Sequence, residues 1–161
     1  MDALRDVVLV IAMVSVGLMA GVFFAFAVAV MPGLARTDDK TFVGAFQAMD
    51  RAIINPLFLS VFVGALAITV LAGAAHLGEE DRSALPWILA AAVLYIVTIV
   101  ITARVNVPLN DAIKAAGDPD QIDVSATRKR FNEATWVRWN VVRAILTTAA
   151  LACLGVAFAV V

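Results

Sequence analysis

Four long apolar segments, separated by polar loops, make up most of this chain. Charged side chains are absent from residues 7–35, 52–78, 83–103 and 144–161. A helix of about 20 apolar residues crosses the hydrocarbon core of a bilayer. Helices are expected because they bond their backbone groups internally, as lipid requires. The pattern therefore predicts an all-α fold, a four-helix transmembrane bundle formed by one four-span domain over residues 1–161.

The first polar loop has the pattern of an amphipathic helix lying at the membrane interface. Thr37 or Asp38 can cap this helix at its start. Most of the charged residues lie off its apolar face, which is formed by Phe42, Phe46, Met49 and Ile53. Asn55–Pro56 then begins the second span, with asparagine as the cap and proline at the first helical position.

The third polar loop is interrupted at residues 117–120, which read Gly-Asp-Pro-Asp. After this break, Ser125 or Thr127 can begin a helix, which we expect to run through Trp136 into the last span. The loop between the second and third spans is short, so these two spans are predicted to form an antiparallel hairpin.

Basic residues are distributed unevenly among the loops, and this predicts the orientation. The first and third loops carry ten of them, whereas the N-terminus and the second loop carry only Arg5 and Arg82. Loops rich in lysine and arginine stay in the cytoplasm. We therefore expect a multi-pass protein of the cell membrane, with loops one and three and their short helices cytoplasmic and both termini outside.

Composition excludes several classes of function. The mean hydropathy is +0.95 and 16% of the residues are charged, against about 25% in soluble domains. A net charge of −1 argues against a nucleic-acid partner. One cysteine, Cys153, and one histidine, His76, leave a transition metal or haem without a pair of ligands. We expect no metal and no cofactor of that kind, although a hard ion held by carboxylates stays open. The expected partners are the membrane and a hydrophobic small molecule or lipid.

Small residues recur four apart in the first span, at Gly17, Gly21, Ala25 and Ala29. This spacing puts them on one helical face, where another helix can approach closely. Two interpretations are open: a homodimer interface through Gly17, Gly21 and Ala25, or packing inside the same bundle.

The last span contains an arginine. Only 18 residues follow Arg143, or about 27 Å of helix at 1.5 Å per residue. To cross about 30 Å, the helix must include Arg143 and Asn140. Trp136 shares their face, and Trp139 lies one turn from Arg143. Such an arginine is either paired or lines a wet cavity, or it extends to the interface as an anchor beside the tryptophans.

Other polar residues are predicted to lie at the same membrane depth. Arg51 and Asn55 lie where the second span begins. Arg104, Asn106 and Asn110 lie where the third span ends, and Pro108 loosens the backbone between the two asparagines. Three carboxylates can pair with the arginines: Asp50, Asp111 and Glu133. The cluster forms either a polar pocket open to the cytoplasm or a belt of ion pairs that fixes the bundle.

Four segments resemble one known family. They are GVFFAFAVAVMPGL, FVGAFQAMDRAIINPLF, RVNVPLNDAI and TRKRFNEATWVRWNVVR, in that order along almost the whole chain. Together they resemble the anthrone-oxygenase-like integral membrane family, and NVPLN (106–110) and WVRWNVVR (136–143) are the most specific pieces. The resemblance implies oxidation of an anthrone to an anthraquinone with O₂ and without metal, flavin or haem.

The residue types present suit that chemistry. An anthrone has an acidic C–H between aromatic rings, and its anion reacts with O₂ directly, so a site needs a base, groups that stabilise charge and aromatic walls. The candidate catalytic residues are Arg143, Asn140, Asn106, Asn110 and Asp111. The candidate substrate-binding residues are Trp136, Trp139, Arg51, Asn55, Phe46 and Phe131. His76 lies at the opposite end of the second span, which leaves Asp111, Asp50 or Glu133 as the base, with nothing in the sequence to rank them.

Two classes of function therefore remain. The first is a cofactor-independent oxygenase of the anthrone oxygenase type, which acts on a hydrophobic polycyclic substrate. The second is a non-catalytic membrane protein, either an accessory subunit or a small-molecule-binding protein, in which the polar cluster holds only the bundle or a partner.

Overall fold

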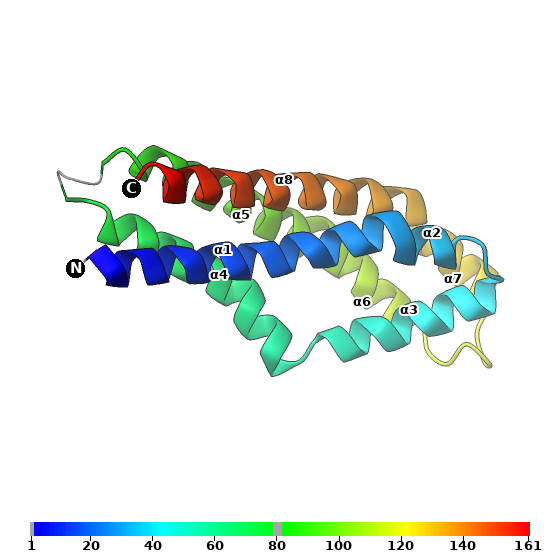
Figure 1. Ribbon diagram of the computed structural model, residues 1–161. Helices are drawn as coiled ribbons and strands as arrows, with labels where there is room; N and C mark the ends of the chain where they lie inside the picture. Colours follow the sequence, from blue (N-terminus) through cyan, green and yellow to red (C-terminus); the bar gives the residue numbers. More distant parts are fainter. Residues whose placement is uncertain (1, 79–81) are drawn as a thin grey trace.

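The computed structural model describes residues 2–78 and 82–161, and within them every regular element is helical (Figure 1). In chain order the elements are α1 (Asp2–Ala25), the π-helix η1 (Phe26–Val30), α2 (Met31–Leu34), α3 (Asp39–Ile53), α4 (Pro56–Ala75), α5 (Leu85–Ile101), the π-helix η2 (Thr102–Asn106), α6 (Val107–Ala115), α7 (Val124–Phe131) and α8 (Glu133–Ala159).

Four long segments are apolar enough to cross a membrane, and they cover Ala3–Leu34, Pro56–Ala75, Leu85–Ala115 and Val124–Ala159. The predicted all-α bundle with four spans is thus confirmed, and the chain is a multi-pass membrane protein. Helix α8 packs along both α1 and α5, and α4 packs along α1. The start of α1 and the end of α8 lie at the same end of the bundle (Figure 1).

Small residues fill much of the interior between the spans. Ala12, Ala65, Ala91 and Ala150 are fully buried, whereas large side chains such as Leu57 cover the outside. This distribution suits a bundle in lipid, where close backbone approach drives association and the outside faces hydrocarbon. Gly17 faces Leu151 within the bundle. Gly21, Ala25 and Ala29 are exposed, so the dimer through this stripe stays a prediction.

Two of the spans contain a short π-helix, and in each case a proline explains it. Proline cannot donate to the carbonyl four residues earlier, and its ring crowds that carbonyl. Pro32 and Pro108 lie in the first turns of α2 and α6, so the carbonyls concerned belong to Val28 in η1 and to Arg104 in η2. The backbone widens there, and hydrogen bonds form between residues five apart. Met31 N–H donates to Phe26 O, and Val107 N–H donates to Thr102 O. The loosening expected at Pro108 therefore takes the form of a π-turn.

Side-chain caps set where the shorter helices begin. Asp38 caps α3 by accepting from Thr41 N at 2.9 Å, and the Thr41 hydroxyl donates to the same carboxyl at 2.7 Å. These two donors lower the pKa of Asp38. Asn55 caps α4 by accepting from Phe58 N at 3.0 Å, as its place before Pro56 predicts.

The start of the last helical segment differs from the sequence expectation. Helix α7 begins at Val124 and is capped by Asp123, which accepts from Ala126 N at 2.9 Å, and not by Ser125 or Thr127. It also does not run unbroken into the last span. Asn132 has φ 53°, a left-handed conformation that asparagine tolerates, and it ends α7 while its side chain caps α8.

Helix α3 packs beside the extended ends of the other spans, over a second apolar core. This core contains Phe42, Phe46, Ile113, Phe131 and Trp136. Two polar anchors hold α3 and its preceding loop in place. Gln47 donates to Ile113 O at 2.8 Å and to Gly117 O at 3.0 Å, and Arg128 donates to Thr37 O at 3.0 Å and contacts Asp39 at 3.1 Å. These contacts make α3 one wall of the cavity described next.

Candidate active site

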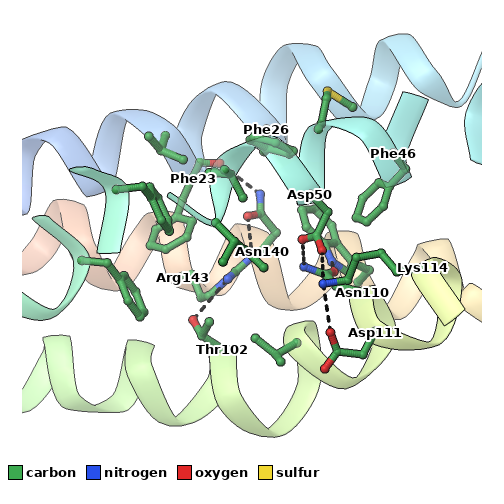
Figure 2. A pocket seen from close by; sticks show the side chains of 18 of the residues that line it. Phe23, Phe26, Phe46, Asp50, Thr102, Asn110, Asp111, Lys114, Asn140 and Arg143 are labelled. Carbon is green, nitrogen blue, oxygen red and sulfur yellow. Dashed lines mark hydrogen bonds and ion pairs between the residues drawn. The ribbon is translucent and has the colours of Figure 1, made fainter. Parts of the chain in front are cut away.

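A cavity of about 210 Å³ lies between α1, α3, the start of α4, η2 with α6, and α8. Most of its wall is apolar, and its aromatic side chains are Phe23, Phe26, Phe46, Phe58, Phe62 and Trp136. Figure 2 shows two polar groups within it, one around Arg143 and Asn140 and another around Asp50 and Asn110. The cavity thus combines flat aromatic surfaces with two separate polar groups.

Arg143 is the charged group on the α8 side of the cavity, and it is 5% exposed. Its two terminal nitrogens donate to neutral acceptors, Thr102 Oγ1 at 3.1 Å and Asn140 Oδ1 at 3.0 Å. Its Nε donates to no atom of the described residues. Among residues 2–78 and 82–161, no carboxylate forms an ion pair with Arg143.

Aromatic rings partly compensate for this unpaired charge. The guanidinium carbon lies 4.4 Å from the centre of the Phe23 ring and 5.6 Å from that of Trp136. Such contacts contribute about 0.5–2 kcal/mol each, less than the several kcal/mol that burial of an ion costs. Asn140 is held in turn by donating to Phe23 O at 3.0 Å. The site therefore keeps a positive charge that an anionic ligand can neutralise.

A hydrogen-bonded chain forms the second polar group. Trp136 Nε1 donates to Asn110 Oδ1 at 2.7 Å, and Asn110 Nδ2 donates to Asp50 Oδ1 at 2.6 Å. Lys114 Nζ lies 2.7 Å from Asp50 Oδ2 and 3.0 Å from Asp111 Oδ1. The chain links the aromatic wall on α8, the carboxylate on α3 and the surface of α6 (Figure 2).

The mouth of the cavity is identified by residues that both line it and are exposed. Ile54, Leu59 and Val107 are 54%, 43% and 41% exposed, and Asp111 joins them at the same rim. Helix α4 has 20 residues, or about 30 Å, the thickness of the hydrocarbon core. Leu59 lies in its first turn, so the mouth opens at the first turn of α4 and is apolar except at Asp111.

The structure brings only part of the sequence-predicted site together. Six of its residues line the cavity: Phe46, Asn110, Asp111, Trp136, Asn140 and Arg143. Phe131 and Asn106 lie buried behind this wall, where Phe131 packs 4.5 Å from the Phe46 ring and Asn106 donates to Trp136 O at 3.3 Å. Trp139 is half-buried on α8 and does not line the cavity.

Arg51 and Asn55 lie outside the cavity, contrary to the expectation that they face it. Consecutive helical residues point about 100° apart, so when Asp50 faces inward on α3, Arg51 faces outward and is exposed. Asn55 is exposed and occupied as the cap of α4. Glu133 lies outside the cavity lining and pairs with Arg128 at 3.1 Å. His76 is buried at the far end of α4, where its Nδ1 donates to Ala72 O at 2.7 Å.

Several lining residues were not selected by sequence reasoning, among them Phe23, Phe26, Thr102 and Lys114. A signal existed for Lys114, because it lies four residues after Asn110 and three after Asp111, on the same face of α6. Phe23 and Phe26 fall in the first segment of the family resemblance. Thr102 had no signal, because a threonine inside an apolar run does not by itself indicate which helix it faces.

Within the described residues, no three His, Cys, Asp or Glu side chains gather as a metal site.

The sequence profile of the anthrone oxygenase family matches residues 55–153. No curated protein and no solved structure matches the chain. The matched segment includes Thr102, Asn110, Lys114, Trp136 and Arg143, whereas the wall formed by α1 and α3 lies before it. Because the match covers more than half of the residues, this chain belongs to the anthrone oxygenase family.

Proposed function

We propose that this protein is a cofactor-independent oxygenase that oxidises a hydrophobic, anthrone-like polycyclic substrate with O₂. The observation that carries the proposal is the state of Arg143: a buried guanidinium on the wall of an aromatic cavity, bonded to neutral acceptors. Buried charges are costly unless paired. A site that keeps one unpaired is suited to an anion that forms only during the reaction.

The cavity supports a substrate of fused rings. Its volume of about 210 Å³ lies below the range of about 300–1,000 Å³ usual for ligand pockets, so the support comes from the shape of its walls and from its open mouth. Phe26 and Trp136 have ring centres 5.8 Å apart, and Phe46 meets Trp136 edge to face at 5.6 Å. These rings offer flat surfaces to a flat ligand. The carbonyl oxygen of that ligand would lie beside Arg143.

The reaction needs O₂ as its only oxidant. A carboxylate removes a proton from the CH₂ between two rings, and the electron pair left behind delocalises onto the carbonyl oxygen beside Arg143. The carbanion carbon then forms a C–O bond with O₂, and the resulting peroxide takes up a proton. Loss of the second C–H proton forms the C=O bond and breaks the O–O bond, and the departing hydroxide leaves with a proton as water. One CH₂ and one O₂ thus give one ketone and one water.

The mouth of the cavity supports access from the bilayer. Its rim at Ile54, Leu59 and Val107 is apolar and exposed, so a polycyclic substrate dissolved in lipid meets a matching surface. We place this end of the bundle on the cytoplasmic side, with both termini outside, because the first and third loops carry ten of the twelve basic residues.

The proposal is tested with purified full-length protein in detergent and anthrone as the probe. We expect quinone absorbance to rise faster than without protein, with one O₂ consumed per quinone, one ¹⁸O atom from ¹⁸O₂ in the product, and no loss of rate after metal chelation. Arg143→Met should abolish most of the acceleration. Arg138→Met, which changes an exposed arginine of the same helix, is the matched control and should keep it.

Two outcomes would count against an oxygenase. A wild-type protein that binds anthrone in the cavity without accelerating its oxidation would indicate the alternative, a membrane protein that binds small molecules. A protein that neither binds nor oxidises anthrone would favour an accessory role, in which the polar groups hold only the bundle.

A further inference from the structure

We infer that Asp50 is the base that removes the substrate proton, with Lys114 and Asp111 maintaining the charge balance around it. This inference rests on the proposed function and identifies a residue that it left open. Asp50 lies in α3, before the segment that the family profile matches. Its assignment therefore comes from the geometry of this chain.

Position separates Asp50 from the other candidate carboxylates. Asp50 lines the cavity and is 7% exposed, whereas Asp111 lies at the rim and is 63% exposed. Glu133 pairs with Arg128 outside the cavity lining. Among the described carboxylates that line the cavity, Asp50 is the buried one. A base that is shielded from water and faces the ligand meets the geometric requirement for proton abstraction.

The hydrogen bonds around Asp50 fix one oxygen and leave the other directed at the cation. Asn110 donates to Oδ1 at 2.6 Å and is itself oriented by the Trp136 indole N–H at 2.7 Å. Oδ2 is contacted by the Lys114 ammonium, whose Nζ lies 2.7 Å away, and a carboxylate oxygen has two lone pairs. Beside the lone pair directed at Lys114, Oδ2 therefore has a second one that can accept a proton, while Trp136 and Asn110 act as positioning residues.

The two cations of the cavity explain how charge can move without creating a new unpaired ion. Before proton transfer, Lys114 is paired with Asp50, and Arg143 lacks a carboxylate partner among the described residues. When the proton moves from the substrate carbon to Asp50, the negative charge moves to the substrate oxygen beside Arg143. Asp111, 3.0 Å from Lys114, then keeps that ammonium paired while Asp50 is neutral. This accounts for a lysine placed between two carboxylates.

Lys114 also gives the buried carboxyl a route to solvent. It is 20% exposed, contacts Asp50 on one side and the exposed Asp111 on the other, and carries protons that exchange with water. A deuteron can reach Asp50 by this route and return to the substrate carbanion. Proton removal can therefore be measured without O₂, separately from the oxidation that follows.

The experiment uses the full-length protein in two parallel assays. The first follows exchange of the anthrone CH₂ protons with D₂O by ¹H NMR in the absence of O₂. The second follows oxidation of anthrone in air. We expect the wild type to accelerate both processes. Asp50→Asn should lower both accelerations by about 10²–10⁴-fold, the usual contribution of a general base, while anthrone still quenches Trp fluorescence as in the wild type. Asp50→Glu should recover part of the rate, and Asp120→Asn, a change at an exposed carboxylate, should alter neither.

The outcomes separate the two claims. If Asp50→Asn remains folded and exchanges and oxidises anthrone at the wild-type rate, the base assignment is overturned while the oxygenase stands. If the wild type oxidises anthrone and Asp50→Asn loses oxidation but keeps exchange, Asp50 acts after proton removal and the inference is also overturned. A wild type that neither exchanges nor oxidises anthrone overturns the proposed function and this inference together.

Discussion

Replacing Arg143 with methionine separates a functional from a structural role, because the two roles predict opposite effects. Methionine keeps a long flexible side chain in the space between Phe23 and Trp136 and removes the guanidinium. If the arginine serves the reaction, catalysis falls while the fold survives. If it belongs to a belt that fixes the bundle, the fold is weakened.

The structure sets the size of both effects. Arg143 donates two hydrogen bonds, at 3.1 Å and 3.0 Å, each contributing about 1.5–3 kcal/mol for a charged donor. Removing the buried cation relieves a desolvation cost of several kcal/mol. These contributions are similar in size and opposite in sign, so we expect the unfolding free energy of Arg143→Met to change by less than about 2 kcal/mol. The loss of an oxyanion donor should lower kcat by about 10²–10³-fold.

The assay combines thermal unfolding in detergent with steady-state oxidation of anthrone. Arg143→Lys is the intermediate variant, because it keeps the charge and loses the planar fork that reaches Thr102 and Asn140 together. It should lose less activity than Arg143→Met. The reasoning is refuted if Arg143→Met loses 3–5 kcal/mol of stability, roughly the cost of breaking a buried ion pair, while its folded fraction keeps the wild-type kcat.

Four further changes test the site and the fold. Trp136→Phe keeps an aromatic wall and removes one hydrogen bond, so kcat should fall about 10-fold with little change in KM; an effect confined to KM in steady-state kinetics would contradict this. Asn55→Ala removes the cap of α4 and should lower the unfolding free energy by about 1 kcal/mol in thermal denaturation, with no loss for the aspartate variant. Val107→Trp at the mouth should raise KM for anthrone, whereas Val93→Trp on the exposed face of α5 should not. Arg130→Cys, in a chain whose Cys153 is replaced by serine, should resist an impermeant label in intact cells; labelling from outside would reverse the orientation.

Features that depend on neighbouring residues along one helix could be predicted from the sequence. The four spans follow from the length of the apolar runs, and the cap at Asn55 follows from its place before Pro56. Helical spacing also placed Trp136, Asn140 and Arg143 on one face, and the three side chains line one cavity. In each case the evidence lies within a few consecutive turns, where geometry is nearly fixed.

Features that depend on contacts between helices could not be predicted in the same way. The pairing of Asp50 with Lys114 joins residues 64 positions apart, and no local pattern selects it over the other carboxylates. The choice between Asp50 and Arg51 depends on how α3 is rotated about its axis, which its packing over Phe131 and Trp136 decides. The break at Asn132 similarly depends on a left-handed backbone conformation, which asparagine tolerates but does not require.

The position of the cavity follows from where the spans depart from regular α-helix. Four straight helices with small residues at their contacts pack closely and leave little space. In this bundle, Pro32 and Pro108 impose π-turns on two spans, and Asn55–Pro56 begins the second span just after α3. The first residues of the π-turns, Phe26 and Thr102, both line the cavity, as do the first turns of α4. A π-turn inserts one extra residue and so rotates the side chains on either side of it relative to each other. In η2 the turn lies between Thr102, which accepts from Arg143 at 3.1 Å, and the residues of α6 that carry the second polar group, Asn110 and Lys114.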